Sequence, residues 1–110
     1  MNTTYCYSTG QRSEVESRET ADVSELIKHL HELMQSKRLL MTKPPGVDGY
    51  LDFYARDDGS IEMEIMDHCN DDFATVDIAM AERVIGIAMT DTRDLLLRQK
   101  LDGLKIDWIT

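Results

Sequence analysis

Cysteine is scarce in this chain, so it cannot form the disulfide framework on which small secreted domains depend. Only Cys6 and Cys69 are present, and two thiols cannot form the several bridges typical of such domains. A single bridge is the alternative, but we expect two reduced thiols in a cytoplasmic protein. The N-terminus favours the same compartment, because residues 1–5 lack the basic start and apolar stretch of a secretory signal.

Long apolar runs and flexible linkers are also missing. No run approaches the roughly 18 residues that a membrane-spanning helix needs, so membrane insertion is not expected. With 6 glycines and 2 prolines in 110 residues, no segment has the composition of a linker. The length suits one hydrophobic core and is too short for two ordinary ones. We therefore expect a single domain over residues 1–110.

Positive charge is the third shortage. The chain has 12 Lys and Arg against 21 Asp and Glu, for a formal net charge of −9. The imbalance is local, because residues 52–77 contain nine acids and one base, Arg56. A surface of this sign repels nucleic acid and anionic lipid and attracts basic partners. The composition therefore disfavours nucleic-acid and membrane binding and favours a basic protein partner.

Apolar periodicity predicts an α+β fold. Apolar residues recur at three- and four-residue steps from Val23 to Met34, and Asp22 with Glu25 resembles a capping box at the start of this helix. Similar patterns predict helices over 78–89 and 91–101, and strands over 3–7, 39–42, 51–56, 61–66, 73–76 and 105–110. The segment around 14–16 fits either a short strand or a loop. The order of elements predicts a mainly antiparallel sheet with helices packed on one face.

Two details of this pattern bear on packing. Gly86 lies inside a predicted helix, where glycine costs about 1 kcal/mol relative to alanine, which suggests close packing at that point. Six methionines lie among or beside apolar periodic positions, and we interpret them as core residues and not as a binding stripe: Met34, Met41, Met63, Met66, Met80 and Met89.

The register of the hairpin over 51–66 follows from burial. A two-residue turn at Asp58 and Gly59 would pair Phe53 with Glu64 and so place a carboxylate against the core. A three-residue loop, 57–59, instead pairs Phe53 with Met63 and Ala55 with Ile61, provided that Gly59 adopts the left-handed conformation. Burial of apolar side chains favours the three-residue loop.

That register predicts an acidic face on the hairpin. Asp52 lies opposite Glu64, and Tyr54 lies opposite Glu62. Like charges placed directly opposite one another destabilise a sheet, so a purely solvating face would be expected to alternate its signs. We predict that this face docks a basic protein with Tyr54 as an aromatic anchor. An ordinary solvated sheet face and a metal site are the alternatives.

The polar stretch from Asp67 to Asp72 is the second candidate region. Its imidazole, thiol and carboxylates are competent metal ligands, but the spacing matches neither a zinc site nor a calcium-binding loop. We interpret it as a polar surface loop, and we add Asp67, Asp71 and Asp72 to the predicted partner-binding residues. A metal-dependent enzyme or metal-binding protein that uses this loop is the alternative.

No motif for catalysis or cofactor binding is recognisable. The chain has no nucleophile elbow and no glycine-rich loop between a strand and a helix. We therefore predict neither catalytic residues nor a cofactor. A structural or regulatory domain that homodimerises through a sheet edge is a further alternative to the binding module.

Several segments resemble the Imm1 family of bacterial immunity proteins, which neutralise polymorphic toxins. These segments are Asp22-Val23-Ser24-Glu25-Leu26 at the start of a helix, Tyr50-Leu51-Asp52-Phe53 at the start of the hairpin, the acidic strand over 61–66, and the closing Leu104-Lys105-Ile106-Asp107-Trp108. The sequence departs from the family in having no proline before the closing strand and a longer helix over 91–101. The resemblance implies an inhibitor that covers a toxin's active site without catalysis. It transfers no individual functional residue.

Overall fold

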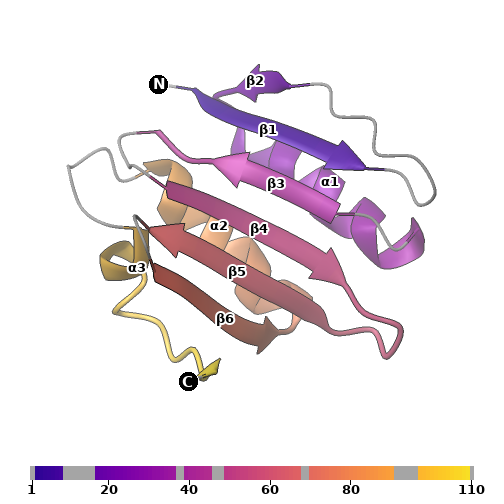
Figure 1. The fold of residues 1–110 in the computed structure, drawn as a ribbon. Helices are drawn as coiled ribbons and strands as arrows, with labels where there is room; N and C mark the ends of the chain where they lie inside the picture. The colour runs from indigo at the N-terminus through magenta and orange to yellow at the C-terminus, as the bar shows by residue number, and fades with distance from the viewer. Residues whose placement is uncertain are drawn as a thin grey trace.

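One antiparallel sheet lies at the centre of the computed structural model, which describes residues 2–8, 17–36, 39–45, 49–67, 70–90 and 97–109 (Figure 1). Every neighbouring pair of strands is antiparallel. Within the described ranges the strands lie side by side in the order β2 (Arg18–Thr20), β1 (Thr3–Ser8), β3 (Leu39–Lys43), β4 (Gly49–Ala55), β5 (Ile61–Asp67), β6 (Asn70–Val76) and β7 (Trp108–Ile109).

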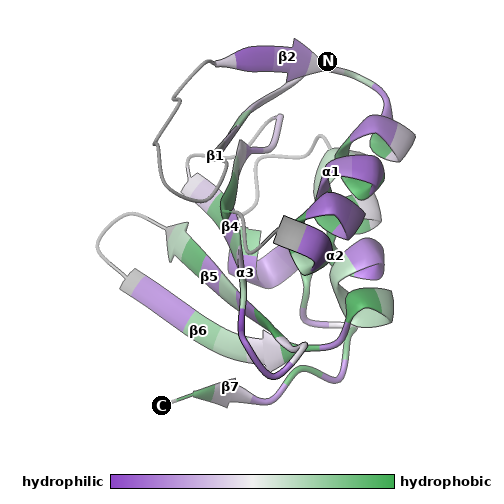
Figure 2. Cartoon of the chain, turned by 90° about the vertical axis from the view of Figure 1, so that its right-hand side faces the viewer, coloured by the Kyte–Doolittle hydropathy of each residue, from purple (hydrophilic) through white to green (hydrophobic). Residues whose placement is uncertain are grey.

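The helices cover one face of this sheet. They are α1 (Val23–Ser36), which connects β2 to β3, followed by α2 (Ile78–Thr90) and α3 (Leu97–Lys100). In Figure 2 the sheet is seen from its side, and α1 and α2 lie together against the same face. The predicted α+β fold, with a mainly antiparallel sheet and helices on one face, is confirmed.

The core fills the space between the helices and the sheet. Strand alternation places one residue from each central strand in a row that faces the helices: Leu40, Phe53, Met63 and Ala74, all fully buried. The helices contribute the residues that pack against this row: Leu26, Leu30, Leu33, Ala81, Val84, Ile85 and Ala88. Burial of these side chains is the main stabilising contribution to such a fold.

The start of α1 follows the predicted pattern in part. The Ser24 backbone N–H donates to Asp22 Oδ1 at 2.9 Å, as expected for an N-cap aspartate. The second half of a capping box would use Glu25 to accept from the Asp22 N–H. That N–H donates instead to Thr20 Oγ1 at 3.0 Å, so the last residue of β2 completes the cap.

The hairpin of β4 and β5 has the predicted register. Asp52 pairs with Glu64, Phe53 with Met63 and Tyr54 with Glu62. Arg56 N–H donates to Ser60 O at 2.9 Å and so closes the three-residue loop. Gly59 in this loop has φ +88°, the left-handed conformation that the predicted loop requires.

Several boundaries differ from the sequence prediction. The stretch predicted as the Asp67–Asp72 loop is mostly strand, because β5 runs to Asp67 and β6 begins at Asn70, with residues 68 and 69 outside the described residues. A short second strand lies at 18–20, and residues 14–16, for which a strand or a loop was expected, fall outside the described residues. The closing strand has only two residues, and of the helix predicted over 91–101 only 97–100 are described as helical.

Two packing interpretations were wrong. A Cβ added at Gly86 would meet no atom of the described residues within 4 Å, so close packing among them does not explain this glycine. Met63 is buried in the core and Met34, Met80 and Met89 pack against it, as predicted, but Met41 and Met66 are wrongly assigned to the core and are only partly buried. They lie on the sheet face that the helices leave open, because each is opposite a residue of that face. Separately, no helix in the described residues is both long and apolar enough to span a bilayer.

Candidate functional site

The sheet face opposite the helices is the candidate site, and we call it the open face. A single row of paired residues crosses it from β1 to β7: Cys6, Met41, Asp52, Glu64, Phe73 and Ile109. A second row contains Leu39, Tyr54, Glu62 and Thr75. A third contains Tyr50, Met66 and Asp71. Because alternate residues point to opposite faces of a sheet, these three rows share one surface.

Asp52 is the most unusual residue of this surface. It lies in the middle of the sheet, yet it is only 1% exposed. Its Oδ1 atom is buried and has no hydrogen-bond partner within the part of the chain that is described. Burial of the carboxyl, and next the nearby negative charge of Glu64, raise its pKa to about 6, although a hydrogen bond from the Thr42 backbone opposes the shift. Asp52 is therefore a carboxyl group without adequate stabilisation of its charge.

Tyr54 and Glu64 lie next to Asp52. The Tyr54 hydroxyl donates to Glu64 Oε1 at 3.4 Å, which is long for a hydrogen bond between two oxygens. Burial first, and then the charges of Glu64 and Asp52, raise the pKa of the Tyr54 hydroxyl, so that it stays protonated as a donor. Burial and the charge of Asp52 likewise raise the pKa of the Cys6 thiol on β1.

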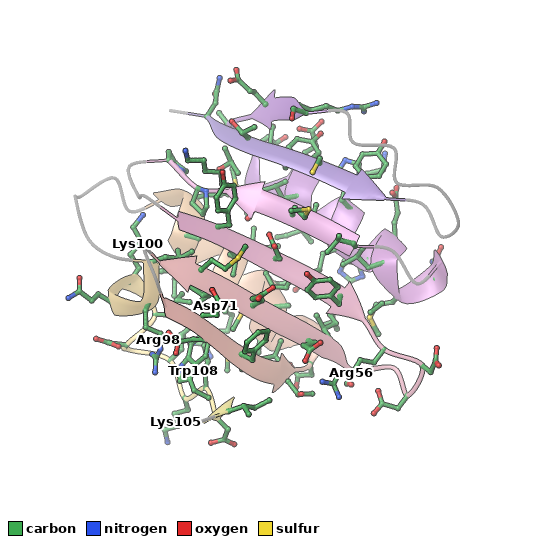
Figure 3. The ribbon with its side chains drawn as sticks, viewed as in Figure 1. Arg56, Asp71, Arg98, Lys100, Lys105 and Trp108 are labelled. Carbon is green, nitrogen blue, oxygen red and sulfur yellow. The ribbon has the colours of Figure 1, made fainter. Side chains whose placement is uncertain are left out.

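The other carboxylates of the open face have different environments. Glu62 Oε1 accepts a 2.8 Å hydrogen bond from Arg56 Nη2, so a cation from the hairpin loop partly neutralises it. Asp71 is exposed on β6. Figure 3 looks onto this face and shows Asp71 on β6 and Arg56 beyond the end of β4. The predicted acidic face thus contains both paired and unpaired carboxylates.

Two of the predicted partner-binding residues are not placed on this face. Asp72 pairs with Ile65, a core residue, and therefore lies on the helix side of the sheet. There its Oδ2 forms an ion pair with Arg98 Nε at 3.6 Å, and the Arg98 guanidinium lies 4.0 Å from the ring centre of Trp108. Asp67 ends β5, and its side chain falls outside the described residues. The structure brings together Asp52, Tyr54, Glu62, Glu64 and Asp71, and it separates Asp72 from them.

The open face is also more apolar than the sequence analysis predicted. Tyr50 is 45% exposed and Ile109 is 56% exposed. The partly buried Met66 and Phe73 lie on the two strands between them, and the partly buried Met41 lies on β3, on the other side of β4. A shallow hollow of about 190 Å³, lined in part by Cys6, Met41 and Tyr50, adjoins the Asp52 row. The sequence contained a signal for the position of Met41. Residues 39–42 form one strand, so adjacent residues such as Leu40 and Met41 must point to opposite faces of the sheet.

Metal binding has no support from the described geometry. No group of three or more His, Cys, Asp or Glu side chains in the described ranges could hold a metal ion. His68 and Cys69, which motivated the metal alternative, lie outside those ranges.

Comparison of the chain with protein-family models, with curated proteins and with solved structures found no match. The resemblance to Imm1 immunity proteins therefore stays a prediction, and the argument for function rests on the open face.

Proposed function

We propose that this chain is a protein-binding domain that docks a basic partner protein on its open face. The observation that carries the proposal is the combination of exposed apolar side chains and unpaired carboxylates on a sheet face that no described helix covers. Contiguous apolar surface within a polar surround is typical of protein-interaction sites. The aromatic and methionine side chains would supply contact area, and the carboxylates would select the sign of the partner's charge.

Charge supports the choice of a basic partner. The net charge of −9 produces a negative potential that accelerates the approach of a positively charged protein. On the open face the described cations Lys43 and Arg56 lie near Tyr50 and Glu62, within 5.8 Å of the ring centre and 2.8 Å of the carboxylate respectively. Asp52, Glu64 and Asp71 form no ion pair with a described cation. Glu64, which is partly buried, and Asp71, which is exposed, are available to a basic surface, whereas Asp52 lies buried beside Glu64.

The kind of activity we propose is inhibition by coverage. A sheet packed on its helices is a rigid platform, and a rigid acidic surface suits the basic cleft with which an enzyme that acts on nucleic acid holds its substrate. The resemblance to immunity proteins favours the same role. In this role the chain itself performs no reaction, and its effect is to exclude substrate from the partner.

Association through a sheet edge is a weaker candidate. In the described part of the chain the two edge strands are β2, with three residues, and β7, with two. Short edge strands offer few backbone groups to a second sheet and are a common protection against edge pairing. We therefore place the interface on the face of the sheet.

Matched charge-reversal variants test the proposal. The open-face variant is Glu64→Lys with Asp71→Lys, and the control is Glu32→Lys with Glu82→Lys on α1 and α2. Each double variant removes two negative charges and adds two positive ones, so both have a net charge of −5 instead of −9 and differ only in where the charges lie. A partner captured from the native cell by the wild-type protein should bind the control with a similar association rate. Its association rate with the open-face variant should fall at least about tenfold and lose most of its salt dependence.

Equal loss in both variants would show that only net charge matters, and retention by the open-face variant would place the interface elsewhere. Either result contradicts the proposal. An acidic partner would contradict it as well. For inhibition, adding the wild-type protein should abolish the captured enzyme's activity, and the open-face variant should require at least about ten times more protein.

A further inference from the structure

We propose that Asp52 and Glu64 form a receptor for one arginine side chain of the basic partner. The inference deepens the proposed function and rests on it. The two residues are directly opposite each other on β4 and β5, which places their Cβ atoms about 4.5–5.5 Å apart. Two carboxylates at this separation can accept hydrogen bonds from a single guanidinium.

An unsatisfied atom points to a ligand at this position. Asp52 is only 1% exposed, and no described group donates a hydrogen bond to its Oδ1. A buried acceptor without a donor destabilises the folded protein, and more so when it is charged. A cationic donor supplied by a partner would remove that cost. This gain would be realised only in the complex.

The fold supplies no cation of its own to the pair in the described residues. The described cations of the open face contact other groups: Arg56 contacts Glu62, and Lys43 lies over the ring of Tyr50. The neighbour of Glu64 is the Tyr54 hydroxyl, at a long 3.4 Å. So weak a hydrogen bond can be exchanged for a charge-assisted one at small cost. Glu64 is therefore free to turn toward an incoming cation.

The surroundings favour arginine over other cations. A guanidinium presents five donors in one plane and stacks on aromatic rings, whereas an ammonium is a compact, strongly hydrated charge. Tyr54 provides a ring beside the pair, and Met41 provides an apolar wall on the opposite strand. The hollow next to Met41 can hold an apolar neighbour of the arginine. A divalent metal would need more oxygen ligands than two carboxylates provide.

A peptide titration tests the receptor directly. The probe is acetyl-Leu-Arg-Leu-amide, and the control peptide contains citrulline, which has the shape of arginine without its charge. In two-dimensional NMR spectra, the arginine peptide should shift the backbone amides of Asp52 and Glu64 in a saturable manner, with a dissociation constant on the order of millimolar. The citrulline peptide should bind at least about tenfold more weakly.

Conservative variants of the protein complete the test. Asp52→Asn and Glu64→Gln should each weaken peptide binding about tenfold. Glu82→Gln is the matched control, since it removes the same charge from α2, which lies on the other side of the sheet from the open face. It should change the affinity less than about twofold. Equal weakening in all three variants would show a diffuse charge effect and overturn the receptor.

The pH dependence provides an independent measurement. The titratable groups that interact with Asp52 in the described residues are the Cys6 thiol on β1, the Tyr54 hydroxyl on β4 and the Glu64 carboxylate on β5. On β3 the residue opposite Asp52 is the uncharged Met41, and the nearby Lys43 contacts Tyr50. If binding needs ionised Asp52, with its pKa of about 6, peptide affinity at pH 5 should be about tenfold lower than at pH 7.5. The Asp52→Asn variant should lose this dependence. A wild-type affinity that is flat over this range would contradict the inference.

The outcomes separate the inference from the proposed function. If the peptide leaves Asp52 and Glu64 unaffected while the captured partner still depends on the open face, the receptor is wrong and the docking face stands. If the peptide binds as expected but no partner depends on the open face, the docking proposal is wrong. In that case the inference, which names a partner's arginine, is overturned with it.

Discussion

Asp52 and Glu62 show how strongly the environment of a carboxylate decides its chemistry. Both lie on the open face of one hairpin, ten residues apart in sequence. Glu62 stays partly exposed and has Arg56 as its counterion, whereas Asp52 is buried beside another acid. Burial and a like charge both disfavour ionisation, so the two residues respond differently to pH and to a partner.

Replacing Asp52 should stabilise the free protein at neutral pH. Its folded pKa of about 6 lies above the ordinary aspartate pKa of 3.8, so the folded state binds the proton more tightly. The corresponding stability is present below about pH 4 and is lost as the pH rises through about 6. The full shift corresponds to about 3 kcal/mol. Chemical denaturation should therefore show Asp52→Asn gaining about 1–3 kcal/mol over the wild type at pH 7, and much less at pH 4.

The same comparison with Glu62→Gln controls for removal of one negative charge. The difference in the free energy of unfolding between Glu62→Gln and the wild type should not rise from pH 4 to pH 7 as it does for Asp52→Asn, because Glu62 is paired at the surface. If Asp52→Asn is destabilising at pH 7, then the native structure satisfies the carboxylate in a manner that the amide cannot reproduce. The unpaired Oδ1 atom would then lose its significance for binding.

Glycine has opposite effects on stability in two elements of this fold, a helix and a hairpin loop. Gly86 lies inside α2, where an added Cβ would meet no atom within 4 Å in the part of the chain that the structure describes. Gly59 lies in the hairpin loop with φ +88°, a conformation that strains any residue with a side chain. The first glycine is replaceable, and the second is required by the loop that sets the register of the candidate site.

Alanine substitutions at these positions should have opposite signs. Gly86→Ala should raise the free energy of unfolding by about 0.5–1 kcal/mol, because it improves helix propensity and restricts the unfolded chain. Gly59→Ala should lower it by about 1 kcal/mol or more. Thermal and chemical denaturation measure both. Destabilisation by Gly86→Ala would mean that α2 needs a closer neighbour than the described residues provide.

For the whole molecule, the concentration of negative charge has a thermodynamic consequence. A net charge of −9 in 110 residues destabilises the compact state through self-repulsion. Added salt screens such repulsion over a Debye length of about 10 Å at 0.1 M. The free protein should therefore become more stable as the salt concentration rises, while its association with a basic partner becomes slower.

A salt series of thermal denaturation checks this expectation. Raising sodium chloride from about 0.05 M to about 0.5 M should increase the Tm by several degrees, which corresponds to about 1 kcal/mol for a domain of this size. The two charge-reversal variants, with a net charge of −5, should each gain less. A Tm that is flat or falls would show that the ion pairs of the fold, such as Arg56 with Glu62, outweigh the repulsion.

What the sequence alone determined was local. The three-residue loop, the register of β4 with β5 and the apolar stripe of α1 all follow from residue periodicity and from the conformational freedom of Gly59. These features depend on neighbours close in the chain. The acidic row of Asp52 and Glu64 could be predicted for the same reason, because a hairpin brings its own residues together.

Tertiary packing decided the rest. Asp71 and Asp72 are adjacent in sequence and point to opposite faces of the sheet. The helices cover the face of Asp72 and leave the face of Asp71 open. The neighbouring strand β3, which is not part of the hairpin, places Met41 opposite Asp52. Burial on that face leaves Asp52 with a raised pKa and an unpaired oxygen. Periodicity can assign a side chain to a face, but its solvation depends on residues distant in sequence, and these meet only in the folded chain.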